Sequence, residues 1–276
     1  MLINRMKKII LLLSVVLIAT SCSQYQKVLK SKDTGLKYTT AEKLYNEAKA
    51  GEGNTSRKFK KALRLFEQIV PEYRGKPQAQ KLMFIYADTY YELGDNYLAG
   101  YQFERFVETY PQSEKIEEAA FKGAKSYYFL SPRYDLDQTD THKAIEKLQA
   151  FINRFPESDK LEEANDLVTE LRIKLEKKAY EIAKQYHHTR NYKAAITAFN
   201  NFILEYPGSP FREQAFFYKF DSAYQYAINS YAYAMPERLK EARNFYEDYL
   251  RYYPEGKFVS EAEAALTDIN EKEQNL

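Results

Sequence analysis

Four stretches of this chain repeat one pattern: AGYQFERFVETYPQS (99–113), AIEKLQAFINRFPES (144–158), AITAFNNFILEYPGS (195–209) and ARNFYEDYLRYYPEG (242–256). Each begins with alanine, carries large apolar residues four and seven positions later, and has an aromatic residue just before a proline. A weaker copy, ALRLFEQIVPEYRGK (62–76), has Arg74 in place of the proline. Offsets of 0, 4, 7 and 11 lie on one face of an α-helix. Each copy therefore predicts an amphipathic helix, which the proline ends because it lacks an N–H and clashes with the preceding turn.

A second alanine recurs eight residues after each proline and predicts that a further helix follows each copy: Ala119, Ala164, Ala215 and Ala262. Serine stands two residues after three of the prolines, where we expect it to cap this second helix: Ser113, Ser158 and Ser209. Pro210 then falls at the expected first helical position. Each unit is thus predicted to be two antiparallel helices, and only a stack of units buries the apolar faces.

The second unit resembles the tetratricopeptide repeat, because Tyr90, Gly94, Ala99, Phe103 and Pro111 stand at the spacing of that motif. The resemblance implies an all-α fold, a right-handed superhelix of about five tetratricopeptide-like helix pairs (an α-solenoid). The repeating alanines are 37, 45, 51 and 47 residues apart, against about 34 in the minimal repeat. Most first helices or loops are therefore expected to be longer, and most of the 26 Tyr and 17 Phe to pack between helices.

The composition argues against several classes of function. A net charge of +2 does not favour binding to nucleic acid, and a single cysteine excludes a disulfide framework and a cysteine-based zinc site. The histidines are His142 and the adjacent His187 and His188, which project from different helix faces and cannot chelate a metal together. No glycine-rich phosphate loop or G-x-S-x-G motif is present, and pairs such as Lys115–Glu118 are interpreted as solvated helix surface. We expect no enzymatic activity, no metal or other cofactor, and no small-molecule substrate.

The first residues have the pattern of an export signal. A basic start is followed by an apolar run at 9–19, about 11 residues long, which is too short to span a bilayer. MKKIILLL is a complete start by itself, so translation begins at Met1 or Met6. The run closes with Ala19-Thr20-Ser21-Cys22.

This closing tetrapeptide resembles the lipobox of bacterial lipoproteins. The resemblance implies that Cys22 carries a diacylglycerol and a fatty acyl chain, which anchor the protein in a membrane. Ser23 follows with no acidic cluster behind it, which by lipoprotein sorting rules favours the outer membrane, with the protein facing the periplasm. The alternative is an ordinary secretory signal in which Cys22 has no role.

Nearly all of the chain after Cys22 resembles the BamD family, the tetratricopeptide lipoproteins of the outer-membrane β-barrel assembly (BAM) machinery. The similar stretches are 42–69, 73–99 and 177–211, and the segment LSPRYDLDQTDTHKAI (130–145) resembles the loop before the family's third repeat. That segment carries Asp, Thr and Pro at turn and cap positions, so its own chemistry is expected to order it. The resemblance implies binding to BamA, to other BAM lipoproteins where they exist, and to unfolded outer-membrane proteins.

On this basis the chain is divided into four parts: a signal peptide (1–21), a lipidated linker (22–37), a client-binding half with units 1–2 and the start of unit 3 (38–126), and a BAM-docking half with units 3–5 and a C-terminal capping helix (127–276).

In tetratricopeptide geometry the first helix of each pair faces the concave groove. Counting back from Ala99 places five residues on that face, and Tyr45 holds an equivalent position in the first unit: Lys81, Phe84, Asp88, Tyr91 and Glu92. Tyr45, Phe84 and Tyr91 would form an aromatic floor, and Lys81 would bind a client's terminal carboxylate. The alternatives are that Phe84 turns into the core and that Tyr91 packs on Tyr45.

Contacts with BamA would fall, by family likeness, on a turn and on the last unit: Arg190, Asn191, Tyr192, Tyr233, Glu237 and Arg238. The alternative for Tyr192 is an aromatic that only packs the turn.

Two other readings share the fold and the anchor. One is a tetratricopeptide lipoprotein adaptor in cell-envelope division or peptidoglycan synthesis, which only its partners would distinguish. The other is a glycan-binding uptake lipoprotein, which would expose tryptophan, and this chain has none.

Overall fold

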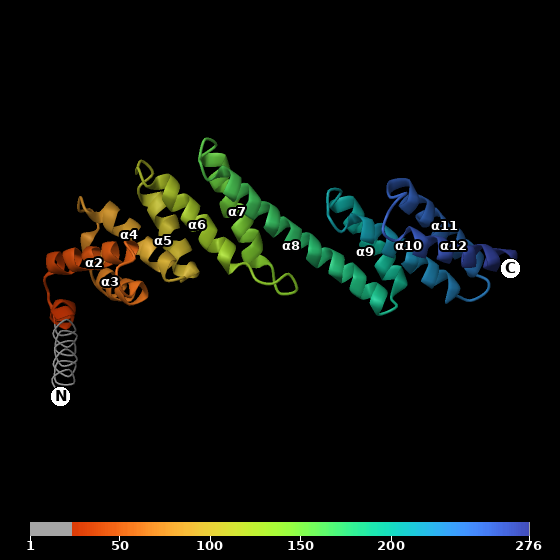
Figure 1. Cartoon of the computed structure of the whole chain (residues 1–276), viewed down its shortest axis with the longest axis horizontal. Helices are drawn as coiled ribbons and strands as arrows, with labels where there is room; N and C mark the ends of the chain where they lie inside the picture. The colour runs from red at the N-terminus through yellow and green to blue at the C-terminus, as the bar shows by residue number, and fades with distance from the viewer. Residues whose placement is uncertain (1–23, 276) are drawn as a thin grey trace, which may run out of the picture. The chain divides into compact units, whose positions relative to one another are not determined.

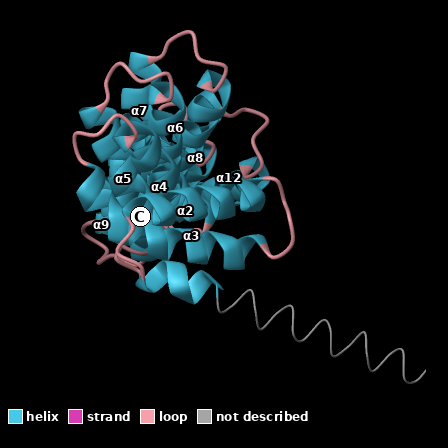
Figure 2. Cartoon of the chain, turned by 90° about the vertical axis from the view of Figure 1, so that its left-hand side faces the viewer, coloured by secondary structure: helices cyan, strands magenta, loops and turns pink. Residues whose placement is uncertain are grey.

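The computed structural model describes residues 24–275, which form helices joined by turns and loops, with no strand among them (Figures 1 and 2). Residues 24–30 are helical, and eleven α-helices and one short 3₁₀ helix follow in this part of the chain. Their bounds are α2 Thr34–Lys49, α3 Thr55–Ile69, η1 Val70–Tyr73, α4 Ala79–Glu92, α5 Asn96–Thr109, α6 Ile116–Leu130, α7 Thr139–Arg154, α8 Leu161–His188, α9 Tyr192–Glu205, α10 Arg212–Ile228, α11 Met235–Tyr252 and α12 Val259–Gln274. The pairs α2–α3, α4–α5, α6–α7, α8–α9 and α10–α11, closed by α12, confirm the predicted all-α, tetratricopeptide-like α-solenoid class.

The chain folds as two compact units. The first runs to Ser131 and includes Asp140–Asn165, and the second comprises Pro132–Thr139 and Asp166–Leu276. One boundary between the units, between Asn165 and Asp166, falls inside α8, a helix of 28 residues. This long helix also explains the 51-residue spacing between two of the repeating alanines. The division into a client-binding half (38–126) and a docking half (127–276) stays a prediction.

Part of the predicted linker at 22–37 belongs to the first unit. The side chain of Tyr25 is buried, and its hydroxyl donates a hydrogen bond to the carbonyl of Lys61 at 3.0 Å. The Lys61 ammonium lies 4.9 Å from the centre of the Tyr25 ring. Val28 and Leu29 pack on the same core, so an apolar face on this short helix docks it against α3.

The predicted apolar helix face is confirmed in both units. The five repeating alanines are fully buried: Ala62, Ala99, Ala144, Ala195 and Ala242. The large residues four and seven positions later are also buried, among them Phe103 and Phe106 in the first unit and Phe199 and Phe202 in the second. Small residues at the helix crossings thus allow close approach, and the aromatic rings fill the space between neighbouring helices.

The serines after the prolines have a different role from the predicted one. In each case the serine Oγ accepts a hydrogen bond from the backbone N–H two residues later, which belongs to Lys115, Lys160 or Phe211. The helix begins at the residue that follows this donor. The serine therefore closes the turn before the helix and does not cap the helix itself. Pro210 lies in this turn as well, and α10 begins only at Arg212.

In the turn after the fifth copy, different residues supply the hydrogen-bond acceptor. Gly256 stands where three of the other copies have serine, and the N–H of Phe258 donates to the hydroxyl of Tyr249 at 3.1 Å. The three copies with serine have phenylalanine at the position of Tyr249, and the weaker first copy has Ile69. A Cβ atom added at Gly256 would lie 2.6 Å from the Tyr249 hydroxyl, so glycine leaves the space which that hydroxyl occupies.

The segment between α6 and α7 is ordered by its own hydrogen bonds, as its turn residues predict. The buried Gln138 amide donates to the carbonyls of Arg133 and Leu136 at 2.8 and 3.0 Å. The Asp135 carboxylate accepts two bonds of 2.6 Å from the Arg133 guanidinium. The Lys178 ammonium of α8 also donates to the Leu136 carbonyl, at 2.5 Å, and ties this segment to the second unit.

Candidate functional site

The first unit contains a cavity of about 380 Å³ with walls from α2, α4, α5 and α6. Tyr45, Phe84 and Phe106 supply aromatic surface to it. Charged residues line the other side, three lysines against one glutamate: Lys49, Lys81, Lys115 and Glu118. The lining therefore places lysine ammonium groups next to aromatic rings.

Asp88 is fully buried beside this cavity and connects three helices. Its carboxylate accepts a 2.6 Å bond from the Tyr45 hydroxyl of α2 and a 2.5 Å bond from the Lys122 ammonium of α6. The Lys49 ammonium lies 3.3 Å from the same carboxylate. Burial alone would lower the pKa of Lys122, but the charges of Asp88 and Glu118 outweigh it and the pKa is raised. Lys122 is therefore charged and holds the Asp88 carboxylate in place.

The three lysines of the cavity each have a carboxylate partner: Lys49 with Glu92 at 2.5 Å, Lys81 with Glu42, and Lys115 with Glu118 at 2.9 Å. The Lys81 and Lys115 side chains remain 67% and 57% exposed. Since an ammonium has three N–H donors, either lysine can bind a second anion that approaches from solvent.

Two of the predicted groove aromatics line the cavity, although both are buried. The sequence allows Phe84 to face the groove or the core, and the structure shows both. Its ring packs edge-on against Phe103 and Phe106, with centroids 6.0 and 5.6 Å away, while one side faces the cavity. Tyr45 packs edge-on against Phe59 and offers the cavity a similarly restricted surface.

The other predicted groove residues lie at or beside the same place. Lys81 lines the cavity, Asp88 binds Tyr45, and Glu92 pairs with Lys49. Tyr91 is half-buried and packs edge-on against Phe103 at 6.3 Å, not on Tyr45 as one alternative has it.

Sequence reasoning missed most of the cationic residues of this site: Lys49, Lys115 and Lys122. Lys115 and Glu118 have the spacing of a surface ion pair, and they do form one, but the pair also lines the cavity. Lys122 and Asp88 are 34 residues apart in the sequence. A local sequence pattern therefore contains no information about their contact.

In the second unit, Arg190, Asn191 and Tyr192 form the turn between α8 and α9. Arg190 adopts a left-handed conformation with φ of 61°. Tyr192 packs edge-on against His187 with centroids 5.9 Å apart, as expected of an aromatic that packs the turn. Arg190 and Asn191 are exposed beside it.

The three predicted docking residues of the last unit lie around the α10–α11 loop. Tyr233 is 86% exposed and stacks on Tyr231, which is 77% exposed, with ring centroids 5.9 Å apart. Glu237 is in the first turn of α11, and the Arg238 guanidinium lies 3.9 Å from the centre of the Tyr226 ring. This loop therefore presents aromatic surface to solvent.

A histidine, an aspartate and a serine meet between α8 and α10. His187 Nε2 lies 3.3 Å from the Asp221 carboxylate, and its Nδ1 lies 3.0 Å from the Ser222 hydroxyl. Burial lowers the pKa of His187, which the charge of Asp221 opposes, and burial raises the pKa of Asp221. Ser222 is fully buried and donates to the Tyr218 carbonyl at 2.5 Å, so this group is a polar contact between helices and not a nucleophile with its base.

Cys22 and the predicted signal peptide lie outside the described residues. Among residues 24–275, no helix combines the length and the apolar character needed to cross a bilayer, and no three potential ligand residues gather as a metal site.

Comparison with known proteins gives one family. The family model YfiO, described as "Outer membrane lipoprotein", matches residues 37–234 and, a second time, residues 176–273. Among solved structures, 25 chains match. One is described as "Podosopora anserina putative kinesin light chain nearly identical TPR-like repeats", and it is 12% identical with a TM-score of 0.33, over 78% of this chain and 97% of that chain. No curated protein matches the chain.

Proposed function

Because the chain belongs to the YfiO family of outer membrane lipoproteins, which is the BamD family, we propose that it is a non-enzymatic scaffold in outer-membrane β-barrel assembly. It is held by lipid on Cys22 at the periplasmic face of the outer membrane. There it binds BamA, other BAM lipoproteins where they exist, and unfolded outer-membrane proteins as clients. The family match runs through both compact units, which supports a role for the whole described chain.

Client binding is supported by one observation above all, the cavity of the first unit with its aromatic walls and its three lysines, two of which are more than half exposed. An extended segment that ends in an aromatic residue suits it. The ring packs against Phe84 and Tyr45, and the terminal carboxylate binds Lys81 or Lys115, whose ammonium groups reach solvent. A charged hydrogen bond to such a carboxylate adds specificity to the apolar contact.

A peptide-binding measurement tests this site. The probe is a fluorescent peptide that ends in phenylalanine with a free carboxylate, compared with the same peptide amidated at its end. We expect the free acid to bind about tenfold more tightly than the amide. Lys115→Glu should remove most of this difference, because reversing the charge repels the carboxylate.

Lys160→Glu is the matched control. Lys160 holds the same position in the next repeat, since its N–H also bonds to the serine hydroxyl, but it does not line the cavity. If the acid and the amide bound equally tightly, or if Lys160→Glu reduced the difference between them as much as Lys115→Glu does, the cavity would not be a site for a terminal carboxylate.

The partner decides between the proposed function and its alternative. A tagged full-length chain is purified from outer membranes in mild detergent, and the bound proteins are identified by mass. Recovery of a BamA-like barrel with periplasmic repeats supports the assembly function. Recovery of division or peptidoglycan-synthesis proteins without such a barrel would instead support the adaptor alternative.

The docking surface proposed for BamA can be tested in the same experiment. Tyr233→Ala removes an aromatic side chain that is 86% exposed, so it should reduce the recovery of BamA without unfolding the chain. Leu204→Ala is the matched control, since Leu204 is 73% exposed on α9 in the same unit. A similar reduction of BamA recovery in both variants would show that Tyr233 does not bind BamA specifically.

A further inference from the structure

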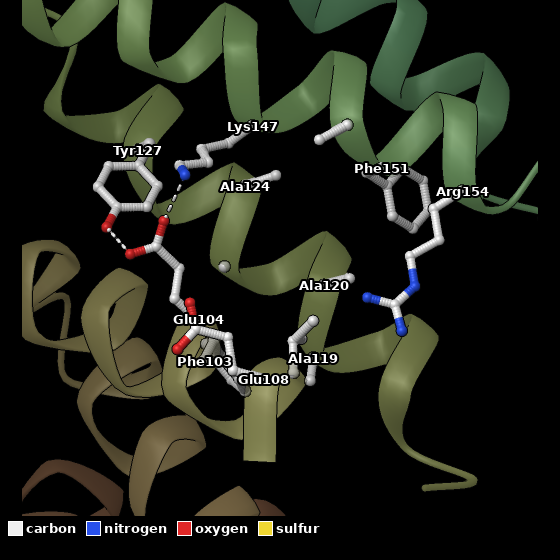
Figure 3. A pocket seen from close by; sticks show the side chains of 13 residues that line it. Phe103, Glu104, Glu108, Ala119, Ala120, Ala124, Tyr127, Lys147, Phe151 and Arg154 are labelled. Atoms are coloured by element: carbon white, nitrogen blue, oxygen red, sulfur yellow. Dashed lines mark hydrogen bonds and ion pairs between the residues drawn. The ribbon is translucent and has the colours of Figure 1, made fainter. Parts of the chain in front are cut away.

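A second cavity, of about 200 Å³, lies between α5, α6 and α7 in the first unit (Figure 3). Its floor is made of very small residues of α6, which leave space that larger side chains would fill: Ala119, Ala120, Gly123 and Ala124. The exposed Ala150 of α7 stands at its rim. Phe103 and Phe151 add aromatic surface. The cavity is open to solvent between an acidic face of α5 and a basic face of α7.

One end of this cavity is closed by an ion pair. The Glu104 carboxylate binds the Lys147 ammonium at 2.9 Å and accepts a 2.7 Å bond from the Tyr127 hydroxyl. Figure 3 shows these three side chains together on one side, with Arg154 across the cavity from them.

The other end stays open. Glu108 of α5 and Arg154 of α7 both line the cavity and are exposed. Neither forms an ion pair among the described residues, whereas Glu104 and Lys147 on the same two helices do. A carboxylate and a guanidinium therefore flank an apolar hollow with their charges available to a ligand.

This cavity is separate from the candidate client site. On α6, Glu118 and Lys122 belong to the client site, while Ala120 and Ala124 line the second cavity. Residues two apart on an α-helix point about 200° away from each other. The two sites thus lie on opposite faces of α6, and a ligand can occupy one without blocking the other.

We propose that this cavity is an anchor site for a segment of a partner protein. The segment inserts one side chain of leucine or phenylalanine size between α5 and α7. It also carries an acidic residue that binds Arg154 and a basic residue that binds Glu108.

The size and surroundings of the cavity support this occupant. A cavity of about 150 Å³ holds a benzene molecule, so 200 Å³ suits one large side chain and is too small for a long acyl chain. Tyr97 and Tyr101 are 68% and 48% exposed on the neighbouring surface of α5. Tyrosine and arginine around a pocket that takes one apolar side chain are typical of the energetic centre of a protein interface.

Selection from a library of short peptides, each with a central leucine or phenylalanine, tests the proposal on the full-length chain in detergent. We expect the selected peptides to carry one acidic and one basic residue near the central residue. Changing the central residue to alanine should weaken binding at least about tenfold. Ala150→Leu fills the cavity from its rim and should weaken binding by a similar factor, while Ala264→Leu, at an exposed alanine of α12, should not.

The charges are tested by a reciprocal exchange. Arg154→Glu should weaken binding about fivefold, and changing the acidic residue of the peptide to lysine should restore it. Arg172→Glu, at an exposed arginine of α8, is the control. Ala120→Met is a second filling variant that keeps the test valid if Ala150→Leu lowers stability.

Three results would overturn the proposal. One is a selection that yields no binder. Another is a set of peptides that bind the filled variants as tightly as the natural chain. The third is concentration-dependent self-association that Ala150→Leu abolishes, since the occupant would then be a second copy of this chain.

Discussion

Tyr249 and Gly256 depart from the other repeats together, because the Tyr249 hydroxyl accepts the N–H of Phe258 and Gly256 leaves space for that hydroxyl. Three repeats use a serine hydroxyl to accept the N–H that opens the turn, and the fifth uses the Tyr249 hydroxyl. The acceptor is preserved although it comes from a different residue. The chemistry of a repeat can therefore be constant where its sequence is not.

A double-mutant cycle tests this exchange. Tyr249→Phe leaves the Phe258 N–H without its partner and should cost about 1–3 kcal/mol of unfolding free energy. Gly256→Ser alone should cost more, because a Cβ atom meets the Tyr249 hydroxyl at 2.6 Å. The double variant rebuilds the serine turn and removes the clash with the Tyr249 hydroxyl, but not the contacts of that Cβ with the Glu213 carboxylate at 2.7 Å and Tyr253 Cβ at 3.0 Å. It should still be more stable than the sum predicts, by about 1–3 kcal/mol. Urea denaturation measures all four proteins, with Gly208→Ala as the control because nothing lies within 4 Å of its Cβ position. Additive costs would contradict the exchange.

His187 makes stability depend on pH. Burial lowers its pKa in the folded state, whereas in the unfolded state it is near 6.5. The unfolded chain therefore takes up a proton at His187 first, and the contribution of His187 to stability falls as the pH decreases through about 6.5, by at most ~1.4 kcal/mol per pH unit. The raised pKa of Asp221 contributes with the opposite sign.

Melting temperatures at pH 7.5 and 5.5 measure the effect. We expect the natural chain to lose more stability than His187→Gln over this range, and the exposed His142→Gln to behave as the natural chain does. Parallel losses in the natural chain and in His187→Gln would show that His187 does not carry the dependence.

At the scale of single elements, the sequence predicts what is local. The helix faces follow from a repeated spacing of apolar residues. The ends of the four helices that carry the proline-containing copies follow from the prolines, because both signals lie within a few residues. The length of α8 could not be predicted in this way, since nothing in the spacing says whether the extra residues form a loop or continue a helix. The binding site was predicted only in part for a related reason: Asp88 meets Tyr45 and Lys122, which are 43 and 34 residues away in the sequence.

The segment before α7 supplies a prediction about an element. Gln138→Ala removes the amide that bonds to two backbone carbonyls of the loop. It should cost about 1–3 kcal/mol and speed amide hydrogen exchange within residues 131–138. Gln112→Ala, at an exposed position in another turn, should change neither. Unchanged exchange in Gln138→Ala would show that other contacts suffice to order the loop.

At the scale of the whole molecule, the chain consists of two compact units, each with a core of its own. In repeat proteins, stability is the sum of the repeats and the interfaces between neighbours. A defect in one unit should therefore affect that unit most.

Phe103 and Phe199 allow a matched test, since they hold the same repeat position in different units and are both fully buried. Replacement of either by alanine should cost about 3–5 kcal/mol. Hydrogen exchange should then show the greater loss of protection in the unit that carries the substitution. Equal loss throughout both variants would mean that the chain unfolds as one cooperative body.

The exchange between Ser209-type turns and the Tyr249–Gly256 pair has a consequence for protein engineering. A designer who brings only one of these two positions to the commonest residue of the repeats would place serine at 256 beside tyrosine at 249, or phenylalanine at 249 beside glycine at 256. The first choice creates a steric clash, and the second leaves the part-buried N–H of Phe258 without its acceptor. Residues 249 and 256 must be treated as one variable, with phenylalanine–serine and tyrosine–glycine as its two permitted values.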